Sequence, residues 1–111
     1  MAETDVAVLF CTVPDADNGR KIAAGLLEKK LAACINAIPG VESMYTWEGK
    51  METSQEVLLK IKTQRSLVEK ATSAIVTMHP YDEPEVIAVP VVGGAKGYLD
   101  WVKESTTGAE V

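Results

Sequence analysis

The chain alternates between apolar runs that lack helical spacing and stretches with the 3.6-residue period of amphipathic helices. Residues 5–13 (DVAVLFCTV) are β-branched and apolar at successive positions, which predicts a central strand covered on both faces. Pro14 and the helix-capping residues Asp15 and Asp17 follow. Residues 20–33 then show a broad apolar arc, which predicts the first helix.

A long hairpin is predicted next. Residues 33–47 form its first strand, with a bend or bulge at Pro39-Gly40. Residues 48–50 make the turn, and residues 55–63 return with period-two alternation. The polar face of this returning strand carries Glu56, Lys60 and Lys62.

The second half of the chain predicts a helix, a strand and a short helix. Residues 65–78 place apolar side chains along one stripe at helical spacing, and His79-Pro80 ends that helix because proline disfavours helical geometry in the residue before it. Residues 85–92 form the last strand. Residues 95–104 form a short amphipathic third helix.

The order of elements predicts an α+β fold. With right-handed crossovers, strand-helix-strand-strand-helix-strand makes a ferredoxin-like βαββαβ sandwich with strand order four-one-three-two, a long hairpin and an extra C-terminal helix. One layer of helices leaves the other sheet face uncovered, so we expect that face to pack on copies of the same chain. We also expect one domain over residues 1–111 with its core at about 5–104, and frayed tails at 1–4 and 105–111.

Composition excludes several classes of partner. With 11 Lys and Arg against 16 Asp and Glu, the net charge of -5 argues against nucleic-acid binding. No segment approaches the roughly 20 apolar residues that cross a bilayer, and the first residues lack the basic start of a signal peptide. We therefore expect a soluble, cytoplasmic protein without nucleic-acid or membrane partners.

His79, the single histidine, is the strongest polar candidate for a site. It is either a metal ligand or proton shuttle with Asp82, Glu83 and Glu85 nearby, or a cap for the end of the preceding helix. A lone histidine without a partner at ligand spacing is a weak metal signal. The flanking prolines stiffen the loop, which favours binding but equally serves to steer the connection, so both interpretations stay open.

The two cysteines, Cys11 and Cys34, are soft ligands that suit Cu(I), although small buried thiols are common in strands. Their spacing argues against a disulfide scaffold or a zinc knuckle. In the predicted sheet another strand separates them, which puts the two sulfurs about 10 Å apart. They would not share an ion within one subunit.

The tip of the predicted hairpin favours a contact between subunits, and the absence of enzyme motifs argues against catalysis. Tyr45, Trp47, Glu48 and Lys50 cluster at the tip, where amphipathic aromatics favour a subunit contact over stacking on a base or sugar. There is no Gly-rich phosphate loop, no G-x-S-x-G and no Cys-His pair at useful spacing. We therefore expect a protein that is not an enzyme.

Four segments together resemble the CutA divalent-cation tolerance family, over about residues 6–102. They are LAACINAIPG (31–40), YTWEGK (45–50), HPYDEPEVIAVPV (79–91) and GYLDWV (97–102). The resemblance implies a stable homotrimer of ferredoxin-like subunits, similar to PII signalling proteins and associated with tolerance to copper and other divalent ions. It implies metal binding at Cys11, Cys34 and His79. It also implies that the Tyr, Trp and Glu residues of the hairpin and C-terminal motifs line clefts between subunits. We expect cleft or interface positions at Tyr45, Trp47, Glu48, Lys50, Tyr81, Asp82, Glu83, Glu85, Tyr98 and Trp101.

Two classes of function stay open. In the first, the trimer binds copper or another divalent cation that is not required for folding, with His79 and Cys34 as ligands and loop carboxylates as oxygen donors. In the second, a PII-like signalling or adaptor trimer holds a small organic ligand in clefts lined by aromatic residues. A protein partner is conceivable in either class, and the sequence does not name it.

Overall fold

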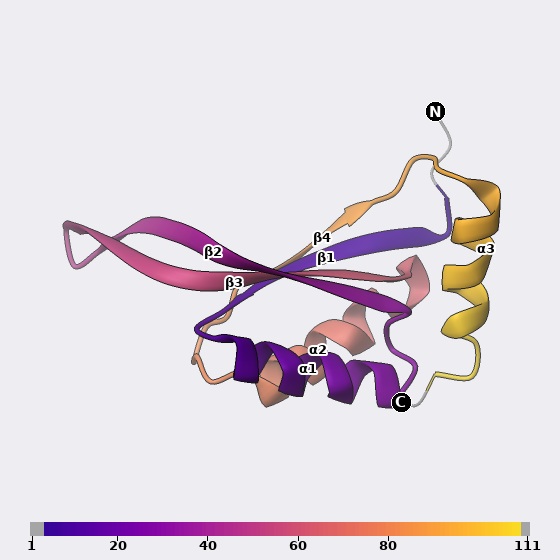
Figure 1. Cartoon of the computed structure of the whole chain (residues 1–111), viewed down its shortest axis with the longest axis horizontal. Coiled ribbons are helices and arrows are strands. Elements are labelled where there is room, and N and C mark those ends of the chain that lie inside the picture. Colours follow the sequence, from indigo (N-terminus) through magenta and orange to yellow (C-terminus); the bar gives the residue numbers. More distant parts are fainter. Residues whose placement is uncertain (1–3, 110–111) are drawn as a thin grey trace.

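The strand segments form one antiparallel sheet in the computed structural model, which describes residues 4–109 (Figure 1). The strands are β1 (Val6–Val13), β2 (Cys34–Trp47), β3 (Lys50–Gln64) and β4 (Val86–Pro90). They lie in the order β2-β3-β1-β4, with each neighbouring pair antiparallel. This order confirms the ferredoxin-like arrangement that the sequence predicts.

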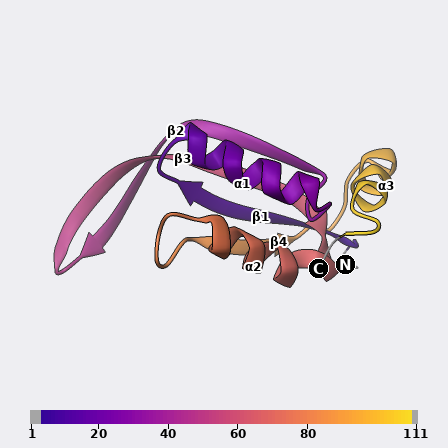
Figure 2. The same cartoon turned by 90° about the horizontal axis from the view of Figure 1, so that it is seen from below.

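The helices cover one face and one end of the sheet. The helices α1 (Ala16–Glu28) and α2 (Val68–Met78) run side by side below the sheet in Figure 1, and Figure 2 shows them from below. A 3-10 turn, η1 (Arg65–Leu67), precedes α2. Helix α3 (Lys96–Ser105) stands at the end of the sheet and contacts β1 and β3. The upper face of the sheet in Figure 1 therefore carries no helix over most of its length.

The core lies between the sheet and the two long helices. Alternate residues of β1 and β3 point toward the helices, and the stripes of α1 and α2 pack on them. Its fully buried members are Leu9, Cys11, Val13, Ile22, Leu26, Leu59, Ile61, Ala71 and Ile75. Each valine, leucine or isoleucine among them contributes roughly 1.5–3 kcal/mol when it leaves water, so this layer holds the helices on the sheet.

Several boundaries differ from the sequence prediction because of local capping. Helix α1 begins four residues earlier than predicted, since the Asp15 carboxylate accepts the Asn18 N–H at 2.8 Å. It ends at Glu28 rather than near 33, because Lys30 adopts φ 58 and the Leu31 N–H bonds the Leu26 carbonyl in a Schellman-type termination.

The hairpin is longer than predicted. Strand β3 begins at Lys50 rather than 55, since the ladder continues to the Trp47–Lys50 pair. Glu48 and Gly49 both have positive φ, as a two-residue type I′ turn requires. The bulge between Ile38 and Val41 confirms the predicted bend. Beyond it the hairpin projects past the body of the subunit (Figure 1).

The uncovered sheet face is apolar along its edge strand. Ile87 and Val89 of β4 pair with Phe10 and Val8 of β1, and paired residues share one face. Ile87 and Val89 are both exposed, as is Ile38 of β2. This confirms the prediction of a bare face with apolar side chains.

The prediction of frayed tails is wrong within the described residues. At the start, the N–H of Thr4 bonds the Val91 carbonyl at 3.0 Å. At the end, α3 extends through Ser105, Thr106 is 1% exposed, and Ala109 packs against the core. The rest of the two tails, residues 1–3 and 110–111, lies outside the described residues.

The hydroxyl of Thr106 fixes α3 to the sheet, because Oγ1 accepts from Gln64 Nε2 and donates to the Val102 carbonyl, both at 2.9 Å. Replacing Thr106→Val keeps the shape and removes both bonds, so the free energy of unfolding should fall by about 1–2 kcal/mol. Chemical denaturation measures this, with Thr107→Val as the exposed control. Equal stability of the two variants would contradict the proposed anchor.

Candidate cation site and its surroundings

His79 caps α2 and is tied to β1. The residue is 8% exposed, and its Nε2 lies 2.8 Å from the Thr12 carbonyl oxygen, to which it donates. Its Nδ1 accepts the N–H of Tyr81 at 3.1 Å. Both ring nitrogens therefore take part in hydrogen bonds within the chain, and the proton lies on Nε2. His79 is the C-cap residue of α2 and its backbone N–H bonds the Ile75 carbonyl, whereas its ring bonds Thr12 and Tyr81 rather than the end of the helix.

Tyr81 continues the network to the hairpin. Its ring centroid lies 4.8 Å from that of His79, and its hydroxyl donates to Glu56 Oε2 at 2.8 Å. Burial, followed by the hydrogen bond to the Glu56 carboxylate, raises the pKa of Tyr81 to about 12. Tyr81 therefore stays protonated at physiological pH and remains a donor to Glu56.

Cys11 and His79 both contact the carbonyl oxygen of Thr12. Its Sγ lies 3.7 Å from the Thr12 oxygen that also accepts from His79. The side chain is fully buried, and this burial raises the pKa of the Cys11 thiol to about 12, with the Glu85 and Glu56 carboxylates adding to the shift. The thiol is protonated at neutral pH, whereas a metal binds the thiolate.

The loop after α2 carries the carboxylates that the sequence proposes as oxygen donors. Asp82, Glu83 and Glu85 are exposed, and the Glu85 carboxylate is close enough to Cys11 to raise the pKa of its thiol. Within residues 4–109 no group of three or more His, Cys, Asp or Glu side chains is arranged to hold a metal ion. The structure thus brings Cys11, His79 and carboxylates to one region without closing a coordination shell.

Cys34 lies elsewhere. It begins β2 and is separated from Cys11 by β3, in agreement with the predicted strand order. It is half-buried and pairs with Lys62 across the strands. Burial, and then the charge and hydrogen bond of Cys34, raise the pKa of the Tyr98 hydroxyl on α3. The subunit therefore offers two separate cysteine environments.

The aromatic candidates form two groups at opposite ends of the subunit (Figure 1). Tyr45 and Trp47 lie toward the tip of the hairpin, where the Tyr45 hydroxyl and Ser54 Oγ are 2.8 Å apart. Tyr98 and Trp101 lie on α3 with their ring centroids 5.6 Å apart. All four are exposed. Glu48 and Lys50 stand at the tip itself and are also exposed.

Sequence reasoning missed two buried charged residues. It placed Glu56 and Lys62 on a solvent-facing side of β3, yet Glu56 is 8% exposed and Lys62 is 7% exposed. The alternation assigned their face correctly, since they lie opposite the core positions of β3. It could not reveal that Tyr81 reaches over Glu56, or that Lys62 lies beside Asn36.

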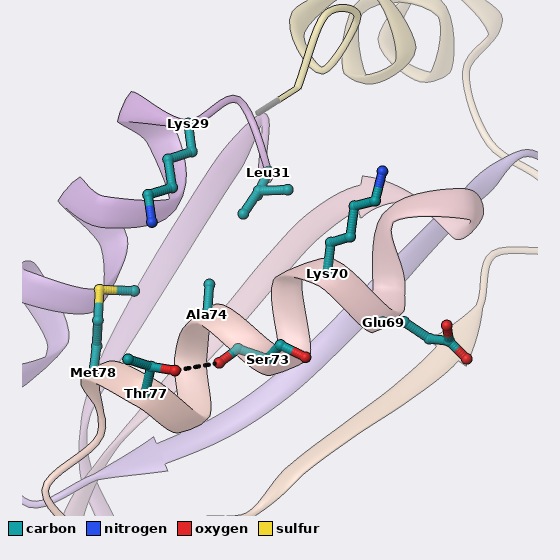
Figure 3. A pocket seen from close by; sticks show the side chains of 8 residues that line it. All are labelled: Lys29, Leu31, Glu69, Lys70, Ser73, Ala74, Thr77 and Met78. Atoms are coloured by element: carbon teal, nitrogen blue, oxygen red, sulfur yellow. Dashed lines mark hydrogen bonds between the residues drawn. The ribbon is translucent and has the colours of Figure 1, made fainter. Parts of the chain in front are cut away.

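A groove of about 450 Å³ lies between α1 and α2, on the far side of the helices from the sheet (Figure 3). Its lining includes Lys29, Lys70, Ser73 and Thr77, and the Thr77 hydroxyl donates to the Ser73 carbonyl at 3.0 Å. None of the residues that the sequence singles out lines this groove. The candidate chemistry therefore lies around β1, β3 and the loop after α2.

Comparison with known proteins decides the family. The model of the CutA1 divalent ion tolerance protein family matches residues 7–105. This chain belongs to the CutA1 family. Within the family it is 50% identical over 99 residues to the chloroplastic CutA of Arabidopsis thaliana, covering 89% of this chain and 54% of that protein.

Solved CutA structures agree with the fold. The CutA1 of Oryza sativa superposes with a TM-score of 0.89 at 46% identity, over 93% of this chain and 94% of that one. The CutA of Xylella fastidiosa superposes with a TM-score of 0.91 at 41% identity, over 93% and 99%. The chain spans just over half the length of the plant CutA relative that it matches. In the part of the chain that the structure covers, no helix combines the length and apolar character of a membrane span.

The two cysteine environments predict different thiol reactivity. At pH 8 we expect 5,5′-dithiobis(2-nitrobenzoic acid) to label Cys34 before Cys11, and Cys11 to react only on unfolding. The variant Cys34→Ser should then show no thiol that reacts in the native state, and early labelling in that variant would contradict the buried position of Cys11.

The raised pKa of Cys11 also has a consequence for stability. The unfolded thiol ionises near its ordinary value of about 9, whereas the folded thiol ionises at about 12. Cys11 therefore lowers the free energy of unfolding as the pH rises from about 9 toward 12.

Proposed function

We propose that the protein acts in tolerance to divalent cations by binding them, without catalysis, in the region where His79, Cys11 and the loop carboxylates meet. One observation supports the proposal. The Thr12 carbonyl oxygen accepts hydrogen bonds from both His79 and Cys11, and the Glu85 and Glu56 carboxylates are close enough to raise the pKa of the Cys11 thiol. Imidazole and carboxylate are donors that suit copper and other transition metals. Copper is the cation to test first.

The hydrogen bonds of the His79 ring favour one of its two nitrogens as the cation ligand. Nε2–H donates to the carbonyl of Thr12, a buried residue, so losing that bond is costly. Nδ1 instead accepts from the N–H of Tyr81 in an exposed loop, where water can replace the imidazole. A cation therefore binds through Nδ1 with carboxylates of residues 82–85 as oxygen donors.

The test is a titration of the reduced protein with Cu(II), followed by native mass spectrometry and equilibrium dialysis. Glu85→Gln and Glu69→Gln remove the same charge, one in the loop after α2 close to Cys11 and one in the first turn of α2. We expect His79→Gln and Glu85→Gln to weaken binding about tenfold or more, and Glu69→Gln to leave it unchanged. A role for Cys34 predicts a similar loss in Cys34→Ser.

Equal weakening in Glu85→Gln and Glu69→Gln would overturn this assignment. The net charge of -5 attracts cations to any part of the surface, and such a field gives weak, salt-sensitive binding with no specific site. Only binding in whole numbers per chain, lost in one variant of a matched pair, supports the proposed site.

We further propose that the protein is a homotrimer that packs through the open face of the sheet, in the cytoplasm. The exposed apolar side chains of β4 support this, because apolar side chains exposed along a sheet face favour a subunit contact. The acidic charge argues against nucleic acid as the partner.

The assembly is tested with two valines of similar exposure, Val89 on the open face (42%) and Val76 on the outer side of α2 (47%). We expect Val89→Lys to lower the mass measured by light scattering from three chains toward the 11.9 kDa subunit, and Val76→Lys to leave it unchanged. A trimer that survives Val89→Lys but not Val76→Lys would contradict the proposed face.

A second function is favoured by the exposed aromatics. Tyr45, Trp47, Tyr81 and Trp101 present apolar surface with polar edges, as residues that line a ligand cleft between subunits do. A PII-like signalling or adaptor trimer would hold an organic ligand there, and its effect on cations would be indirect. Cation binding that is indifferent to His79→Gln and Glu85→Gln favours this function.

A further inference from the structure

The open face of the sheet carries two lysines near the start of β2. Cross-strand pairs place Lys62 between Cys34 of β2 and Val8 of β1, and Lys60 between Asn36 and Phe10. Because paired residues share a face, all six side chains lie on the side away from α1 and α2. The next positions outward, on β4, are the apolar Val89 and Ile87. The two ammonium groups are therefore flanked by apolar surface.

Within the described residues, Lys62 is buried without a carboxylate partner. It is 7% exposed, and its Nζ donates to the neutral Oδ1 of Asn36. Neither the hydrogen bonds nor the ion pairs found among residues 4–109 give Lys62 a carboxylate. Burying a cation is costly unless an anion accompanies it. In the part of the chain that the structure describes, no carboxylate thus offsets the cost of burying the Lys62 ammonium group.

Two exposed lysines of the same chain, unlike the buried Lys62, have carboxylate partners. Lys96 pairs with Asp100 at 2.6 Å, and Lys103 pairs with Asp5 at 2.9 Å, although the side chains of both lysines are more than half exposed. Exposed pairs of this kind contribute little. Among residues 4–109, Lys62 has no carboxylate partner, although it is more buried than either of these lysines and the chain has a net charge of -5.

We propose that Lys62, together with Lys60 and Asn36, binds an oxyanion on the open face of the sheet, namely the carboxylate or phosphate group of a small molecule. Lysine ammonium groups recognise either anion as point charges, and the side-chain amide of Asn36 adds an N–H donor while its Oδ1 holds Lys62 in place. The surrounding apolar side chains strengthen the attraction by lowering the local dielectric. This site uses none of the residues of the proposed cation site and does not depend on it.

The experiment measures thermal unfolding and calorimetric binding with inorganic phosphate and with succinate, at constant ionic strength in sodium chloride. We expect a saturable rise in Tm for the unmodified protein with at least one of these anions. A rise with phosphate identifies a phosphate group as the ligand, and a rise with succinate identifies a carboxylate. Lys62→Met should abolish the rise. The control Lys70→Met removes an exposed lysine of α2 and should retain it.

The variant Asn36→Asp is decisive, because it supplies a carboxylate where Asn36 already contacts Lys62. It should raise the Tm of the ligand-free protein and weaken oxyanion binding by about tenfold or more, since the ammonium is already neutralised. It also keeps the test valid if Lys62→Met does not fold.

Three outcomes would overturn the proposal. One is a Tm that responds to phosphate and succinate no more than to chloride. Another is an equal loss in Lys62→Met and Lys70→Met. The third is an oligomer that dissociates in Lys62→Met while the unmodified protein binds neither anion, because the missing charge then comes from a carboxylate of a neighbouring copy. Failure of the copper titration would leave these results unaffected.

Discussion

Packing of α1 and α2 on a single face of the sheet is the constraint on which the rest of the subunit depends. The fully buried residues of β1 and β3 meet the two helices on that face, and this contact fixes the direction of every alternate side chain along the strands. The opposite residues of the same strands must then point to the uncovered face. Each feature that we associate with assembly or with anion binding follows from this division.

The ends of β1 connect the sheet to the candidate sites. At its C-terminal end, the Thr12 carbonyl holds the His79 ring, so the loop that follows α2 is fixed against the sheet. Tyr81 extends that fixed loop to Glu56 on the hairpin. Carboxylates gather at this end, whereas Lys62 lies on the open face opposite Val8, nearer the start of β1. Opposite charges are thus separated along one sheet rather than paired.

Much of the fold could be predicted from the sequence because its hydrophobic periods are clear. The strand order, the two-helix layer and the bulge after Ile38 all followed from periodicity and proline placement. The early start of α1 was also signalled by Asp15, which the predicted boundary at 20 did not use. The full length of β3 was not predictable from periodicity, because its first residues, KMETS, are mostly polar and are held by the ladder and by the Tyr45–Ser54 hydrogen bond.

The site was less predictable for a physical reason. Alternation tells which face a residue occupies, but not what covers that face, so the burial of Glu56 under Tyr81 is a property of the folded loop alone.

Burial of Lys62 has the same origin and a larger consequence. An exposed lysine on a polar face requires no partner, whereas a buried one without an anion destabilises the subunit that contains it. If the open face is covered by another copy of the chain, the ammonium loses its remaining water, and the need for an anion increases. An anion that binds the covered face more tightly than the open one stabilises the assembly by the same free energy, since binding and association are linked. An oxyanion bound at Lys62 would therefore couple its own binding to oligomerisation.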